Sequence, residues 1–266
     1  MKSQSLFITF KMAFMAIAVV LPGMGQGARA EGSGQGQYYE LRVYSTKSEQ
    51  QQKLVTDYWQ NAAAPAYNRM GVQPIGVFTE LNESLTNKIY VLIPCDSLEV
   101  FAAIPARLAA DAAYQRAASE YLSRPKSSPA YERFESSLSV AFDGMKRLAV
   151  PASLAEGKPW VFELRIYQSP TESKGINKVQ MFNSGEIPLM QEVGLGPVFF
   201  AQTLAGSQMP NLVYMVSGAN LAEHKKHWND FFNAPVWKKL NGDPHYRDNV
   251  SRVISTFLKR TAGSQI

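Results

Sequence analysis

The chain has 266 residues, of which 45% are hydrophobic and 18% charged, with 27 Lys and Arg against 22 Asp and Glu. This length predicts one large or two ordinary domains, and the apolar content argues against an intrinsically disordered chain. A single cysteine, Cys95, excludes an intrachain disulfide framework and every Cys-x-x-Cys zinc or redox motif. The formal charge of +5 suggests acidic partners, but this indication depends on where the basic residues lie.

The first thirty residues have the pattern of a secretory signal peptide. Lys2 and Lys11 give a positive start, residues 12–21 form an uncharged run, and residues 28–30 (Ala-Arg-Ala) form an A-x-A cleavage site. The run is too short for a transmembrane helix, which needs about 20 apolar residues. We therefore expect cleavage near Ala30, a secreted or periplasmic protein, and no stable membrane anchor after cleavage.

The basic character of the chain belongs mostly to this segment. Without residues 1–30 the chain has 24 basic and 22 acidic residues, so the net charge falls to +2. No cluster of five or more Lys and Arg remains, which argues against a nucleic-acid partner. Residues 31–37 are rich in glycine and are expected to form a flexible leader.

The rest of the chain contains one pattern twice, at an offset of 123 residues. The stretch from Tyr39 to Tyr44 (YELRVY) recurs from Phe162 to Tyr167 (FELRIY). Such self-similarity predicts a repeated structural unit. We therefore expect a first domain over 38–144, a linker over 145–159, a second domain over 160–260 and a tail over 261–266.

Both copies predict the same order of elements. Alternation with period two indicates the first strand, and turn-forming residues separate the strands of a later hairpin. The first helix contains Pro65 in one copy and Pro188 in the other, and each proline is expected to kink or split it. The second helix begins at a polar cap, Asp96 or Asn220. The predicted elements cover 38–44, 48–70, 72–81, 88–93, 96–123 and 136–142, then 160–168, 174–193, 195–204, 211–217, 220–240 and 250–258.

The order β-α-β-β-α-β is that of a split βαβ, ferredoxin-like unit. The two helices of such a unit cover only one face of its sheet, so the other face needs a partner. A tandem copy provides one. We therefore predict an α+β fold in which two tandem ferredoxin-like units form a pseudo-dimeric α/β barrel within one chain.

Several motifs carry a resemblance to a known family. They are the two ELR-[VI]-Y strands, the Gly- and Pro-containing second strands, and the aromatic run from His227 to Trp237 with the DPHY sequence that ends at Tyr246. Together they resemble the NIPSNAP family, in its secreted bacterial branch, over residues 38–260. The resemblance implies relatives among cofactor-free monooxygenases, isomerases and haem-binding barrels. The alanine-rich residues 102–118 of the first copy depart from the aromatic pattern.

The two ELR-[VI]-Y strands also carry the candidate catalytic groups. One face of each strand is apolar and the other is charged. We expect the apolar face to lie under the helices and the charged face to point into the space between the two sheets. There the strands would supply a general base, a carboxylate-binding group and a donor to an enolate or phenolate oxygen. The residues are Glu40 and Glu163 as bases, Arg42 and Arg165 as ligand-binding groups, and Tyr44 and Tyr167 as donors.

The hairpin strands supply further ligand-binding candidates. Phe199 and Phe200 are adjacent, so one of the two rings is expected to face the space between the sheets. Tyr90 and Tyr214 are matching tyrosines of the two copies and are assigned to the same site. Such a pocket would bind a small, largely apolar ligand that carries an anionic or carbonyl oxygen.

All three histidines lie in the second copy, and two of them lie on its second helix. His224 and His227 are three residues apart and could share a face. Zinc needs a third ligand, and Lys225 and Lys226 indicate a wet stretch, so no metal site is predicted. Haem ligation by one of these histidines is a weaker option. Otherwise both side chains are expected to be partly exposed beside Trp228.

The sequence leaves three functions open. The first is a ligand-binding barrel, with oxygenase or isomerase chemistry that needs no cofactor as an option. The second is a non-enzymatic interaction or assembly protein with a filled barrel, in which the Glu–Arg pairs tie the sheets together and the chain could form a homo-oligomer. The third is a haem-binding barrel. The first requires a cavity of at least about 300 Å³ that reaches solvent.

Overall fold

The computed structural model describes residues 34, 36–82, 88–151 and 160–266. The predicted signal peptide (1–30), most of the leader and the second half of the linker (152–159) lie outside these residues. Residues 35–266 form one unit. No helix in the described ranges is long and apolar enough to cross a lipid bilayer.

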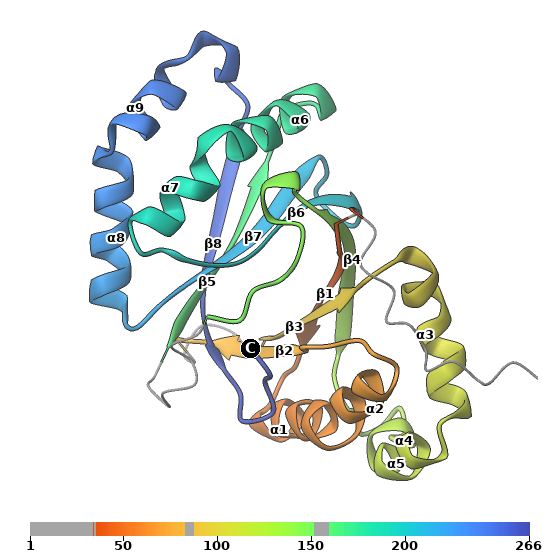
Figure 1. Ribbon diagram of the computed structural model, residues 1–266. Helices are drawn as coiled ribbons and strands as arrows, with labels where there is room; N and C mark the ends of the chain where they lie inside the picture. The colour runs from red at the N-terminus through yellow and green to blue at the C-terminus, as the bar shows by residue number, and fades with distance from the viewer. Residues whose placement is uncertain (1–33, 35, 83–87, 152–159) are drawn as a thin grey trace, which may run out of the picture. The chain divides into compact units, whose positions relative to one another are not determined.

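Eight strands of the described chain form one closed barrel (Figure 1). Their order around the barrel is β1-β3-β2-β8-β5-β7-β6-β4, and every neighbouring pair is antiparallel. Each copy contributes four adjacent strands, and the pairs β2–β8 and β4–β6 join the copies, so the predicted pseudo-dimeric barrel is confirmed. The strands are β1 (Tyr38–Ser45), β2 (Gly76–Glu80), β3 (Lys88–Cys95), β4 (Arg133–Ala141), β5 (Val161–Gln168), β6 (Gly196–Ala205), β7 (Asn211–Gly218) and β8 (Arg252–Arg260).

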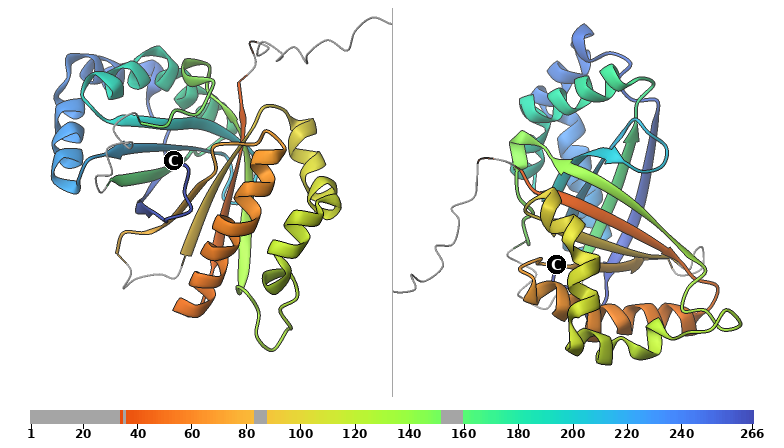
Figure 2. Two further views of the ribbon diagram at one scale, coloured as in Figure 1. Left: turned by 60° about the horizontal axis from the view of Figure 1, so that its bottom comes forward. Right: turned by 90° about the vertical axis from the view of Figure 1, so that its right-hand side faces the viewer.

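The helices lie outside the barrel in two groups, one beside the strands of each copy (Figure 2). The first group is α1 (Glu49–Tyr58), α2 (Ala64–Arg69), α3 (Leu98–Ala110), α4 (Ala112–Ala117) and α5 (Ser119–Leu122). The second group is α6 (Glu172–Met181), α7 (Ile187–Glu192), α8 (Leu221–Asn233) and α9 (Pro235–Gly242). Short turns of other helix types are η1 (Trp59–Ala63), η2 (Asp143–Met145), η4 (Phe182–Glu186) and η5 (Pro244–Tyr246).

The predicted interruption of each first helix is a π-helical turn. The turn η1 lies between α1 and α2, and η4 lies between α6 and α7. Pro65 and Pro188 occupy the first turn of the helix that follows. Proline has no N–H and its ring clashes with the carbonyl four residues earlier in a regular helix, so a wider turn at this point is the expected accommodation.

The second helices differ from the prediction in two details. Ser97, not Asp96, caps α3, because the Ser97 side chain accepts a hydrogen bond from the backbone of Val100. Asn220 caps α8 as predicted. Both helices are also broken, the first at Asp111 and the second before α9. A new polar cap in one case and a proline at the start of α9 in the other explain the breaks.

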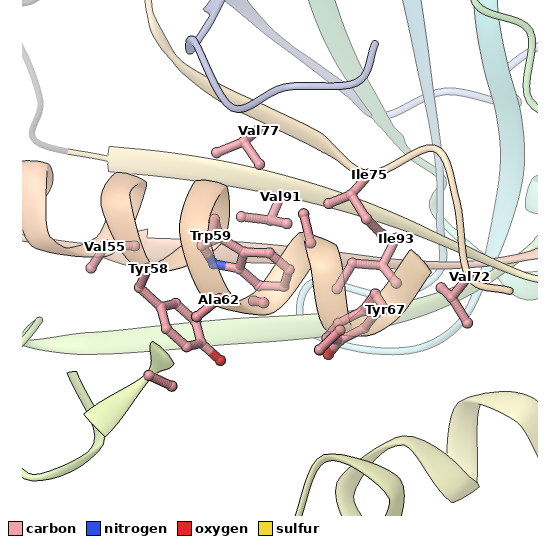
Figure 3. Close-up of a cluster of buried hydrophobic side chains, with 14 of the residues drawn as sticks. Val55, Tyr58, Trp59, Ala62, Tyr67, Val72, Ile75, Val77, Val91 and Ile93 are labelled. Carbon is pink, nitrogen blue, oxygen red and sulfur yellow. The ribbon is translucent and has the colours of Figure 1, made fainter. Parts of the chain in front are cut away.

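The closed barrel reverses the predicted orientation of the first strands. Leu41 of β1 and Leu164 of β5 lie in the interior cluster, together with side chains from the other strands. The charged faces lie outside, under the helices. In the first copy the space between helices and sheet also contains many apolar side chains: Trp59 packs against β3 beside Val91 and Ile93 (Figure 3). The interior is enclosed by backbone that already pairs with itself, so it offers charged groups few partners, whereas the helix layer provides them.

Segments that precede and follow the domains close one end of the barrel. Gln37, predicted to belong to the flexible leader, is buried and its side chain accepts a hydrogen bond from the backbone of Leu148. The tail pairs with the chain near β2, where Gln265 donates to the carbonyl of Ile75. Ile266 is buried in the interior cluster. The interior is therefore filled at the end where β1 and β5 begin.

Candidate functional site

A cavity of about 200 Å³ opens at the opposite end of the barrel. The later residues of β1 and β5 and the facing residues of neighbouring strands form its apolar walls. Below it, aromatic side chains such as Phe78 and Phe162 fill the interior. The cavity is therefore a part of the interior that is open to a ligand in this structure. The apolar walls are Leu41, Val43, Leu164, Ile166, Val213 and Ile254.

Polar groups of the lining are bonded to one another and to the protein. The hydroxyl of Tyr90 donates to Oε1 of Glu80 at 2.6 Å. The hydroxyl of Thr203 donates to Oδ1 of Asn211 at 2.6 Å. Burial, followed by the hydrogen bond to Glu80, raises the pKa of Tyr90 well above its usual value. Tyr90 therefore stays a neutral phenol at physiological pH.

The cavity receives few of the residues that the sequence assigned to it. Tyr90 lines it. Phe199 lies in the interior cluster below it, whereas Phe200 packs under the helices, so the prediction that one of the two rings faces inward is confirmed. Tyr214 lies in the helix layer, where its hydroxyl donates to that of Tyr167 at 2.8 Å.

In the first copy the charged strand face forms a compact cluster under α1 and α2. Glu40 accepts two hydrogen bonds from Arg42, at 2.5 and 3.0 Å, and one from Ser136 at 2.7 Å. Arg42 also donates to the hydroxyl of Tyr67 at 3.2 Å. Tyr44 is buried on the same face. These groups satisfy one another, and Glu40, Arg42 and Tyr44 lie across the barrel wall from the cavity.

In the second copy the corresponding carboxylate has four partners. Glu163 accepts from Arg165 at 2.6 Å, Trp228 at 2.6 Å, Ser255 at 2.5 Å and the Nε2 of His224 at 2.8 Å. Burial opposes ionisation, but the hydrogen bonds from His224, Ser255 and Trp228 and the charge of Arg165 outweigh it. They lower the pKa of Glu163 to about 2.

The predicted placement of the charged residues in the space between the sheets is therefore wrong. Each Glu–Arg pair also lies within one strand and does not tie the two sheets together. Because both faces of β1 and β5 are covered, alternation alone did not reveal which face points inward. The displaced residues are Glu40, Arg42 and Tyr44 of the first copy and Glu163, Arg165 and Tyr167 of the second.

The sequence also missed a buried ion pair next to Tyr167. The Nζ of Lys178 lies 2.5 Å from Oε1 of Glu186, and both side chains are almost fully buried. The ammonium lies 4.8 Å from the centroid of the Phe182 ring. Burial raises the pKa of Glu186, against the influence of Lys178. The signal in the sequence was weak, because the two residues are eight apart on a helix that changes type between them.

The histidines lie outside the barrel. His224 is 1% exposed, so its predicted partial exposure is wrong; its ring bonds to Glu163 and packs against Phe257. The ring of His227 lies against Gly194, in the turn before β6. Neither ring faces the cavity, so neither could ligate a haem iron there. No group of three or more His, Cys, Asp or Glu residues in the described ranges is arranged to hold a metal ion.

Two segments of the chain, residues 39–128 and 162–265, match the sequence model of the NIPSNAP family. The chain belongs to the NIPSNAP family. Each matched segment lies within one copy of the repeated unit, although the first ends before β4, so both copies carry the family pattern. No curated protein sequence matches the chain.

Solved structures with a similar fold cover both copies at once. A candidate monooxygenase from Lactobacillus acidophilus has 8% identity and a TM-score of 0.54, over 85% of this chain and 94% of its own. One from Fusobacterium nucleatum has 8% identity and a TM-score of 0.53, over 85% and 93%. An anthrone oxidase-like protein has 11% identity and a TM-score of 0.50, over 85% and 92%. At these identities the similarity shows only that this NIPSNAP protein has the same fold.

Proposed function

We propose that this NIPSNAP protein binds a small, largely apolar molecule in the cavity at the open end of its barrel. The observation that carries the proposal is the cavity itself, which has apolar walls, a few polar groups and access to solvent. Its 200 Å³ is less than the roughly 300 Å³ expected for a drug-sized ligand. The proposed ligand is therefore no larger than one ring or a short chain.

We include oxidation or isomerisation without a cofactor in this proposal. Proteins with similar barrels include candidate monooxygenases and an anthrone oxidase-like protein. A carboxylate of Glu135 lines the cavity, and that of Glu80 contacts the lining through Tyr90. Either would replace Glu40 and Glu163 as the general base, because a base must reach the proton that it removes.

Native mass spectrometry of protein purified from its own host tests the binding proposal, because a bound molecule adds a discrete mass. Ile254→Trp should fill the cavity and abolish that added mass. Val253→Trp is the matched control, because Val253 is the neighbouring residue on the outer, exposed face of β8. Equal retention of the molecule by both variants would place its site elsewhere.

A second candidate function is assembly with further copies of the chain. Two rings on the outside of the second copy are substantially exposed, Phe232 by 46% and Phe257 by 37%. They flank the buried Trp228 and His224. Sedimentation would show a concentration-dependent oligomer that the double variant Phe232→Ser, Phe257→Ser dissociates. A monomer at all concentrations contradicts this candidate.

We also propose that residues 1–30 direct secretion or export to the periplasm. The support is the charged start, the short apolar run and the Ala-Arg-Ala sequence. The intact mass of the protein from its extracytoplasmic fraction should correspond to a chain that begins near Glu31. Full-length protein in the cytoplasm would contradict the proposal.

A further inference from the structure

We infer that the molecule bound in the cavity presents a hydrogen-bond donor, a hydroxyl or N–H group, and not the anionic or carbonyl oxygen that the sequence suggests. The inference rests on the proposed binding function. It follows from an account of which protons of the lining groups are already used within the protein.

Tyr90 is the first group in this account. Its hydroxyl has one proton, and this proton is directed at the Glu80 carboxylate. Tyr90 and Glu80 thus form a hydrogen-bonded chain that ends at a carboxylate. The Tyr90 oxygen lies at the other end of this chain, in the cavity lining, and its lone pairs can only accept.

Thr203 and Asn211 form a second chain of the same polarity. The proton of Thr203 goes to Oδ1 of Asn211, and Nδ2 of Asn211 donates to the carbonyls of Ser207 and Gln208, at 3.0 Å each. All protons of the two side chains are thus used, and the two carbonyls fix the orientation of the amide. The Thr203 oxygen also lies 3.4 Å from the hydroxyl of Ser139, which donates to it, and it keeps one lone pair as an acceptor at the cavity wall.

The charged lining groups do not reverse this preference. Glu135 lines the cavity and adds a carboxylate, which accepts hydrogen bonds. Lys88 is the one cation among the lining residues, and it is exposed at the beginning of β3. Its ammonium is therefore solvated, and its flexible side chain makes it a weak selector. Gln208 is exposed as well, so the donor of its amide is solvated like that of Lys88. The hydroxyls of Ser137 and Ser207 can rotate and serve a donor or an acceptor equally.

A ligand that carries only acceptors would place its oxygen against the fixed lone pairs of Tyr90 and Thr203. Burial of such an unmatched pair costs enough to lower affinity by about tenfold or more. A donor of the same size and shape would satisfy one of these oxygens. The cavity should therefore discriminate between isosteric ligands by the polarity of a single group.

Three one-ring probes test the inference by calorimetry on the mature chain at neutral pH. They are 4-methylphenol, which donates, 4-methylanisole, which only accepts, and 4-methylbenzoate, which is an anion. We expect 4-methylphenol to bind at least about tenfold more tightly than the other two. Equal affinities, or tighter binding of 4-methylanisole or 4-methylbenzoate, would overturn the inference and leave the binding function intact. Failure of all three to bind would contradict the binding function itself, and the inference with it.

Two variants separate polarity from fit. Tyr90→Phe should reduce the preference for 4-methylphenol over 4-methylanisole by about tenfold, because it removes the oxygen that accepts from the first and opposes the second. Glu80→Gln places an amide beside Tyr90; donation from this amide would release the Tyr90 proton toward the cavity and reverse the preference. Tyr58→Phe is the control, because its hydroxyl pairs with Tyr114 in the helix layer. An unchanged order of affinities in both Tyr90→Phe and Glu80→Gln would overturn the inference.

Discussion

The two copies place the same Glu–Arg pair under their helices and surround it with different groups. Glu40 has only Arg42 and Ser136 as side-chain donors, whereas Glu163 has four. At the offset of 123 residues, Phe101 and Pro105 of α3 stand where α8 has His224 and Trp228. The difference shows that this fold does not require the two extra donors. They are a specialisation of the second copy.

The neighbouring layer repeats this contrast. Lys178 and Glu186 of the second copy correspond by the same offset to Val55 and Ala63 of the first, which are fully buried. The surrounding helices, including the π-helical turns η1 and η4, are the same in both copies. One position pair thus accepts either an ion pair or two apolar side chains. The backbone did not dictate the choice.

The largest expected effect concerns the two glutamates. Glu163→Ala should lower the free energy of unfolding by about 3–5 kcal/mol, because it leaves a largely buried arginine and three further donors without their acceptor. Glu40→Ala should lower the free energy of unfolding by about 1.5–3 kcal/mol less than Glu163→Ala does, since no histidine or tryptophan donates to Glu40. Urea denaturation measures both losses, provided that the slope of the unfolding free energy against urea concentration is the same in each variant as in the wild type. Equal losses would show that His224 and Trp228 add nothing to the second cluster.

The Lys178–Glu186 ion pair can be compared with its counterpart in the first copy by exchanging the residues. Glu186→Ala alone should cost about 3–5 kcal/mol, because it leaves the Lys178 ammonium buried without its partner. The double variant Lys178→Val, Glu186→Ala gives the second copy the residues of the first. It should recover most of that loss, since a buried ion pair is often replaceable by apolar groups at little cost. Additive losses in a double-mutant cycle would contradict this expectation.

Acid should destabilise the charged cluster around Glu163 in the second copy by protonating this carboxylate. Its pKa is about 2 in the folded chain and 4.5 ordinarily, so the folded state favours the ionised carboxylate. That stabilisation is complete above about pH 4.5 and is lost as the pH falls toward 2. The shift corresponds to about 3 kcal/mol. The stability difference between the wild type and Glu163→Gln, measured by denaturation at each pH, should therefore shrink over this range; a constant difference would contradict the lowered pKa.

The smallest expected effect concerns the group that is special to the first copy. The hydroxyl of Tyr67 accepts a hydrogen bond from Arg42. The corresponding residue of the second copy, 123 positions later, is Met190, which has no hydroxyl. Tyr67→Phe should cost only about 0.5–1.5 kcal/mol, because the donor, Arg42, is partly exposed and can turn to water. Thermal denaturation compares it with the wild type. A loss as large as that of Glu40→Ala would mean that Tyr67, and not Glu40, holds Arg42 in place.

Much of the fold was predictable because it depends on short-range patterns. Period-two alternation located the strands, prolines located the interruptions, and the repeat at 123 residues gave the tandem units. The lining of the cavity was mostly not predictable. Of its polar members only Tyr90 was assigned beforehand, because Thr203, Asn211 and Thr256 of the second copy share a cavity with Tyr90 of the first only when the strands of both copies close the barrel. The burial of His224 was missed because Lys225 and Lys226 suggested a solvated stretch, although the spacing to Trp228 marks one helix face.

The sequence by itself determined the duplication, the order of strands and helices, and the membership of each side chain in one of two strand faces. Only the tertiary structure decided which face of β1 and β5 points inward. The physical reason is that both faces are buried, one by barrel closure and one by helices, so hydrophobic alternation does not distinguish them. The partners decide: the helix layer and strand neighbours supply donors such as Ser136 and Trp228 to the glutamates, and the interior supplies almost none.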